Sequence, residues 1–133
     1  MGHKFRNDYS ELAHIDILNA LMKHSNEQFD TYGLDIHSLN AKNKIKEIFN
    51  IPSGDVFFVT GGTQANLLVI SYLLKDYEAV LACNTGHINV HETGAVEATG
   101  HKIISVKNKN GKLTTSSVEQ TVLKHPDEHM VKP

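Results

Sequence analysis

The six residues Gly61–Asn66 join two apolar segments and constrain the fold more than any other part of the chain. The segment before them, Val56–Thr60, predicts a strand, and the segment after them, Leu67–Leu74, continues a helix that begins at about Gln64. The two glycines allow a sharp turn between strand and helix. The first turn of a helix has backbone N–H groups without intrahelical partners and the positive end of the helix dipole. This strand–turn–helix unit therefore predicts a binding site for an anion.

The anion expected at this turn is a single phosphate group. A P-loop would place a lysine and a hydroxyl residue after the glycines, and neither that motif nor a dinucleotide-binding glycine fingerprint is present. The hydroxyl of Thr63 can donate a hydrogen bond to a phosphate oxygen. The alternative is an ordinary turn in which Thr63 caps the helix, because such caps are common and need no ligand.

The rest of the chain predicts an α/β fold with a mainly parallel sheet, because apolar strands alternate with helical segments. Further strands are expected at residues 79–83 and 102–106, and a polar turn at 108–111. Further helices are expected at residues 13–23, 36–49, 89–98 and 116–124. Ser116 and Glu119 resemble a capping box at the start of the last helix.

Length and charge restrict the class of protein. A chain of 133 residues is the size of one domain. With 13 basic and 15 acidic residues, the net charge of −2 gives no reason to expect nucleic acid or a membrane as partner. Cys83 is the single cysteine, which excludes an internal disulfide. The N-terminal residues lack the apolar stretch of a signal peptide, so we expect a cytoplasmic protein.

A second candidate binding segment, Thr85–Ala95, follows the strand at 79–83. Ligands of open parallel sheets lie beyond the carboxyl ends of the strands, so His87 and the glycine turn can contact one ligand. The imidazole could stack on a flat ring while the turn holds the phosphate of that ring. A loop histidine that bonds a backbone carbonyl is the alternative for His87. His91 lies four residues after His87, as two metal ligands on one helix face could. The spacing matches no zinc signature, so we expect no metal site.

Three segments together resemble a known enzyme family. Residues 5–11, 61–66 and 85–95 are similar to the N-terminal portion of threonine aldolases and aromatic amino-acid β-eliminating lyases. These are pyridoxal-phosphate (PLP) enzymes whose large domain has the aspartate-aminotransferase-like fold, called fold type I. The resemblance implies a three-layer α/β/α domain that is incomplete in this chain. A helical arm is expected over about residues 1–50, and the start of the PLP-binding domain over about 51–133.

The resemblance also implies roles for individual residues. The cofactor-binding residues would be Gly61, Gly62, Thr63, Gln64 and His87. The amides of Gly62 and Thr63 and the Thr63 hydroxyl would hold the PLP phosphate, and His87 would stack on the ring. His87 and Glu92 match catalytic positions near the cofactor, and Asn7 and Asp8 match the segment that approaches the substrate.

The lysine that forms the Schiff base with PLP lies later in the family than the segment matched here, and none of the 12 lysines occupies its position. The chain therefore looks cut short at Pro133. The first hypothesis is the N-terminal part of a PLP-dependent lyase that acts on a β-substituted amino acid as a homodimer or homotetramer. The alternatives are a non-catalytic truncated product of low stability, or a fragment that binds PLP or phosphate without lyase activity.

Overall fold

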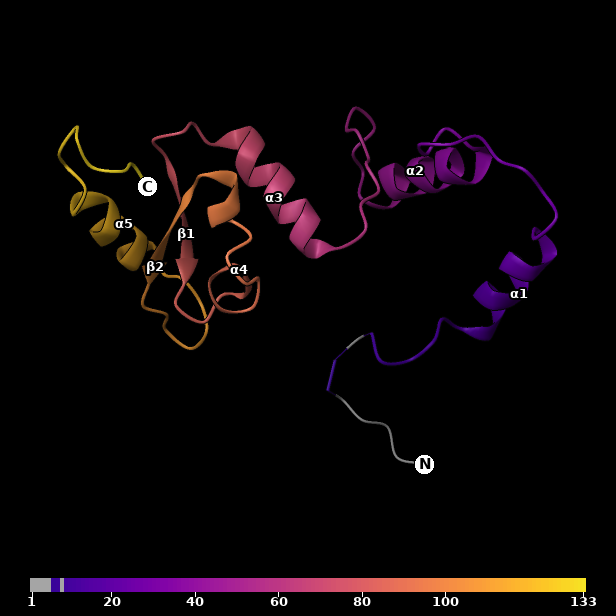
Figure 1. The fold of residues 1–133 in the computed structure, drawn as a ribbon, viewed down its shortest axis with the longest axis horizontal. Coiled ribbons are helices and arrows are strands. Elements are labelled where there is room, and N and C mark those ends of the chain that lie inside the picture. The colour runs from indigo at the N-terminus through magenta and orange to yellow at the C-terminus, as the bar shows by residue number, and fades with distance from the viewer. Residues whose placement is uncertain (1–5, 8) are drawn as a thin grey trace. The chain divides into compact units, whose positions relative to one another are not determined.

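The computed structural model describes residues 6, 7 and 9–133, and Figure 1 shows their helices and strands. The chain divides into two compact units. The first unit ends at Phe57, and the second spans Phe58–Pro133. None of the described residues of the first unit is buried, whereas the second unit contains the apolar core. The fold of the second unit therefore determines how its candidate site residues are held.

The first unit contains two helices, α1 (Ile15–Lys23) and α2 (Ile36–Ile48), close to the predicted ranges. A side chain caps each helix at its N-terminus. The ring Nδ1 of His14 accepts a hydrogen bond from the Asp16 amide, and the Asp35 carboxylate accepts bonds from the amide and hydroxyl of Ser38. These Ser38 hydrogen bonds lower the pKa of Asp35 from its ordinary value, because they favour the charged form.

The second unit is built on two parallel strands, β1 (Ala79–Cys83) and β2 (Lys102–Val106), at the predicted positions. The strands pair in register from Ala79 opposite Lys102 to Cys83 opposite Val106. Its helical elements are α3 (Gly62–Leu73), α4 (His87–Val90), the 3-10 turn η1 (Glu97–Thr99) and α5 (Thr115–Leu123). The buried apolar side chains are those of Ile70, Ala79, Ala82, Val96 and Val106. Across residues 6, 7 and 9–133, no helix has the length and apolar character needed to cross a membrane.

The strand predicted at Val56–Thr60 is wrong. The sheet in the described part of the chain has two strands, β1 and β2, and neither pairs with this segment. A strand needs a neighbour to accept and donate its backbone hydrogen bonds, so β propensity alone does not produce one. At the end of the segment, the Thr60 amide and hydroxyl both donate to the side-chain oxygen of Gln64, each at 2.8 Å.

The helix predicted at residues 89–98 is also wrong, because the chain forms α4, a turn and η1 instead. Thr93 and Gly94 have φ angles of 54° and 76°, in the left-handed region that interrupts a right-handed helix. Gly100, with φ of 86°, ends η1 as expected for a glycine after a helical turn. The polar turn expected at residues 108–111 is confirmed, with positive φ at Asn110 and Gly111.

The capping box of α5 lies two residues before its predicted position. The hydroxyl of Thr114 accepts a hydrogen bond from the Ser117 amide, and the Ser117 hydroxyl accepts one from the Thr114 amide. Ser116 lies inside the helix, so it cannot serve as the cap. A serine at the third helical position replaces the usual glutamate of this motif, which hid the box from pattern reading.

This assignment predicts different effects for two neighbouring substitutions. We expect Thr114→Ala to lower the free energy of unfolding by about 1 kcal/mol, because the amide of Ser117 loses its acceptor. Ser116→Ala should change it by less than about 0.5 kcal/mol, as for a surface position. Urea denaturation followed by circular dichroism measures both, and equal effects would contradict the assignment.

Candidate active site

The N-terminus of α3 is open and carries no side-chain cap. Gly61 is the N-cap residue, and no side-chain hydrogen bond caps the helix. The alternative in which Thr63 caps α3 is therefore wrong, because Thr63 lies within the first helical turn, past the cap position. The side-chain oxygen of Gln64 accepts hydrogen bonds from the amide and hydroxyl of Thr60, and these bonds close the glycine turn.

The space next to the glycine turn is also open. A Cβ atom added at Gly61 or Gly62 would meet no other heavy atom within 4 Å. An uncapped helix N-terminus beside open space can accept an anion at its free amides. The first turn of α3 thus has the properties expected of a phosphate cradle.

The second predicted segment is fixed at the carboxyl end of β1 by α4. The Asn89 side chain donates to the Cys83 carbonyl at 3.2 Å and to the Ser105 hydroxyl at 2.9 Å. A Cβ at Gly86 would lie only 3.0 Å from the Cys83 carbonyl oxygen, so this close approach favours glycine. These contacts hold His87, the first residue of α4, just beyond the end of β1.

A buried carboxylate connects the two segments. One oxygen of Glu92, Oε1, lies 2.6 Å from the side-chain nitrogen of Asn66 and 2.8 Å from Nδ1 of His87. The Glu92 side chain is 0% exposed, whereas that of His87 is 67% exposed. With Glu92 ionised, its Oε1 accepts a hydrogen bond from Nδ1–H of His87, which is the tautomer that leaves Nε2 without a hydrogen. The network thus fixes the orientation of an imidazole that stays open to solvent.

The contacts of His87 test one of its two interpretations, that of a loop histidine bonded to a backbone carbonyl. Its ring bonds a carboxylate, so the alternative of a loop histidine bonded to a backbone carbonyl is wrong. The ring of His91 lies 5.6 Å from that of His87, tilted by 51°. Ring stacking on a cofactor by His87 remains a prediction.

The second oxygen of Glu92, Oε2, is buried and has no hydrogen-bond partner among the described residues. A buried oxygen without a donor is uncommon, because removal from water then has no compensation. The site therefore has unused capacity to accept a hydrogen bond next to His87.

The other predicted residues are not all placed. Asp8 lies outside the described residues, and Asn7 belongs to the first unit, where its side-chain oxygen accepts bonds from the Tyr9 amide and Ser10 hydroxyl. Their role in substrate binding stays a prediction. Asn66 was missed as a site residue, although it lies in the motif Gly61–Asn66, four residues after Gly62 and thus on the same helix face.

Two further residues of the second unit, His101 and Cys83, have weak contacts to backbone carbonyls. Nδ1 of the buried His101 lies 3.4 Å from the Glu78 carbonyl oxygen, and the Cys83 sulfur lies 3.8 Å from the Gly111 carbonyl oxygen. Cys83 is partly buried.

Comparison with known proteins now identifies the family. The sequence matches the beta-eliminating lyase family over residues 16–133. The chain belongs to this family. The resemblance seen in the sequence motifs is therefore confirmed, and the match extends over most of the chain.

Similar proteins are threonine aldolases. A low specificity L-threonine aldolase of Pseudomonas sp. (strain NCIMB 10558) is 34% identical over 117 residues, which are 86% of this chain and 34% of that protein. A second, from Pseudomonas aeruginosa, is 34% identical over 104 residues, or 77% of this chain and 30% of that protein. The chain thus spans about a third of the length of these relatives.

A solved structure confirms the fold. The threonine aldolase of Leishmania major superposes with a TM-score of 0.93 at 43% identity, over 97% of this chain and 38% of that one. The chain therefore has the fold of the corresponding part of a threonine aldolase, and the predicted fold class of this beta-eliminating lyase family member is confirmed.

The hydrogen-bond network gives a testable coupling between α3 and the segment after α4. In a double-mutant cycle, Asn66→Ala and Glu92→Met should show a coupling of about 1 kcal/mol or more, because a hydrogen bond to a charged group is lost. Asn89→Ala is the matched control, since Asn89 bonds Cys83 and Ser105 instead. Its cycle with Glu92→Met should be additive within about 0.5 kcal/mol in urea denaturation. Equal coupling in both cycles would exclude a specific Asn66–Glu92 bond.

Proposed function

We propose that this chain belongs to a PLP-dependent lyase that cleaves β-hydroxy amino acids of the threonine type. The observation that carries the proposal is the bridge from Asn66 through Glu92 to His87, which connects the open α3 N-terminus to an exposed imidazole. The names of the related threonine aldolases favour carbon–carbon cleavage over β-elimination.

The α3 N-terminus suits the phosphate of PLP. A phosphate placed there would accept hydrogen bonds from the amides of Gly62 and Thr63 and from the Thr63 hydroxyl, and the helix dipole would favour its negative charge. The lack of a side-chain cap and the open space at Gly61 and Gly62 support this assignment. Gln64 would act indirectly, by holding the turn closed through Thr60.

His87 suits the pyridine ring of the cofactor. Glu92 fixes the imidazole through Nδ1, so the ring has one orientation in which to receive a flat partner. Asn66 in turn fixes Glu92 from one turn beyond the phosphate-binding amides. The positions of His87 and the phosphate cradle are thus coupled through side chains of the same chain.

When bound, PLP supplies an electron sink for the negative charge left at Cα after the side-chain bond breaks. Glu92 would act beside it as a buried acceptor that keeps the hydrogen on Nδ1 of His87, leaving Nε2 free to face the reacting groups. Asn7 and Asp8 are proposed to contact the substrate amino acid. The lysine that holds PLP covalently is not assigned to any of the 12 lysines of this chain.

We also propose a homodimer or homotetramer, in the cytoplasm, for the whole protein. The proposal rests on the family resemblance, which implies an assembly of two or four copies. Sedimentation velocity tests the proposal, and a protein that stays monomeric at all concentrations would contradict it.

A second candidate function is phosphate-ligand binding without covalent chemistry. It needs only the uncapped N-terminus of α3 and the exposed imidazole of His87. PLP binding, lysine modification and turnover are therefore measured separately.

Variants of the site should separate these functions. We expect Thr63→Val and His87→Ala each to weaken PLP binding by about tenfold, because a charge-assisted hydrogen bond or a ring contact is lost. His87→Phe should retain most of the affinity, since it keeps a flat ring. Thr31→Val and His129→Ala are matched controls outside the site and should bind as the parent does. PLP fluorescence titration gives the dissociation constants.

The chemistry is tested on the full-length protein that contains this chain. Borohydride reduction and peptide mapping should locate PLP on one lysine, and L-threonine should release acetaldehyde and glycine. Binding without modification or turnover would support the second candidate function. Unchanged PLP affinity in both Thr63→Val and His87→Ala would exclude the proposed site.

A further inference from the structure

We propose that His24, Glu27 and His37 form a binding site for a divalent metal ion of the zinc class, which joins α1 to α2. The site lies wholly within the first unit and does not depend on the proposed lyase function. Two imidazoles and a carboxylate are the ligands of one well-known type of zinc site, in which the fourth position stays open.

The donor atoms already lie close together. One ligand atom from each of His24, Glu27 and His37 falls within 4.8 Å of the other two. Around a tetrahedral zinc ion, with bonds of about 2.0–2.2 Å, neighbouring ligand atoms are about 3.3 Å apart. The side chains of Glu27 and His37 are exposed and that of His24 is partly exposed, so small rotations can close this difference.

The backbone holds two of the ligands in place. His24 is the C-cap residue of α1, and the following turn is closed by a hydrogen bond from the Glu27 amide to the His24 carbonyl. This turn places Oε1 of Glu27 2.7 Å from Nδ1 of His24. A metal ion would replace the hydrogen between these two atoms, because both are deprotonated when they bind a metal.

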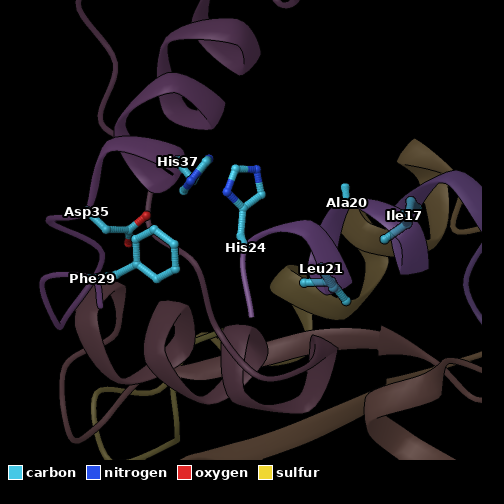
Figure 2. A pocket seen from close by; sticks show the side chains of 7 residues that line it. All are labelled: Ile17, Ala20, Leu21, His24, Phe29, Asp35 and His37. Atoms are coloured by element: carbon cyan, nitrogen blue, oxygen red, sulfur yellow. The ribbon is translucent and has the colours of Figure 1, made fainter. Parts of the chain in front are cut away.

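The third ligand comes from the next helix. His37 is the second residue of α2, and its ring lies 4.9 Å from that of His24 in an edge-to-face arrangement. The Phe29 ring also contacts His37, with ring centroids 5.1 Å apart. Figure 2 shows the His24 and His37 rings beside each other, with Phe29 and Asp35 next to them.

The surroundings suit a bound cation. The rings border a pocket of about 440 Å³ whose wall includes Ile17, Ala20 and Leu21 of α1 (Figure 2). Asp35 also lines the pocket, but its carboxylate is bonded to Ser38 at the N-terminus of α2. Its negative charge therefore favours a cation without being needed as a ligand.

The ligand types select the class of ion. Imidazole nitrogen suits zinc and its neighbours among the transition metals, whereas calcium and magnesium prefer sets made of oxygen. Three protein ligands leave room for a water molecule or another small ligand.

Binding would have a structural consequence for the first unit. None of its described residues is buried, so packing alone holds α1 and α2 together weakly. An ion bound by His24, Glu27 and His37 would link the end of α1 to the start of α2. Because the ion binds only when these residues are brought together, its binding energy would stabilise that arrangement.

The test uses the purified chain, zinc chloride and cobalt chloride. We expect one zinc ion per chain by isothermal titration calorimetry, and the visible absorption of four-coordinate cobalt on titration with cobalt. His24→Ala, Glu27→Gln and His37→Phe should each weaken zinc binding by about tenfold or more. His37→Phe keeps a ring packed on Phe29, so it separates loss of a ligand from loss of packing. His129→Ala, beside Glu128 in the second unit, is the matched control and should bind zinc as the parent does.

A second readout is thermal unfolding followed by circular dichroism. Zinc should raise the melting temperature of the parent chain and of His129→Ala, but not that of His37→Phe. The proposal is overturned if the parent binds no zinc, or if affinity is the same in the parent and all three ligand variants. It is also overturned if His129→Ala reduces binding as much as the ligand variants do.

Discussion

The buried carboxylate of Glu92 is the interaction on which the candidate active site depends. A carboxylate without exposed surface must receive hydrogen bonds, and its donors come from Asn66 on α3 and His87 on α4. Since α4 is tied to the end of β1 through Asn89, the carboxylate connects the helix to the sheet. The need to satisfy one charge thus fixes the imidazole relative to the open amides of α3.

The sequence predicted the elements whose partners lie within this chain. The strands at 79–83 and 102–106 pair with each other, so their local apolar patterns were sufficient. The segment Val56–Thr60 has the same kind of pattern but no pairing strand among the described residues, and it forms none. The predicted helix at 89–98 failed for a local reason, because the left-handed conformation of Thr93 and Gly94 interrupts it. Strand formation depends on distant residues that a local pattern does not contain.

The prediction of the candidate sites was limited in the same way, by contacts between residues far apart in sequence. The motif Gly61–Asn66 and His87 were found because strand–turn–helix order and position beyond a strand end are visible in the sequence. The role of Asn66 was not, because it follows from the burial of Glu92, 26 residues later. His24, Glu27 and His37 were not predicted either, since their spacing matches no metal motif. The turn after α1 brings Glu27 to His24, and the start of α2 adds His37.

The two units differ in the contacts that stabilise each of them internally. This difference explains in which unit a bound ligand would matter for the structure. In the second unit, backbone pairing and the Glu92 network join residues far apart in sequence around a buried core. A cofactor phosphate would add to an arrangement that these bonds already fix. In the first unit, Asp35 caps its own helix and His24 bonds a residue in the next turn, so these contacts stabilise each element locally. An ion bound by residues of both α1 and α2 would connect these two helices. The free energy of its binding would therefore stabilise their arrangement within the first unit.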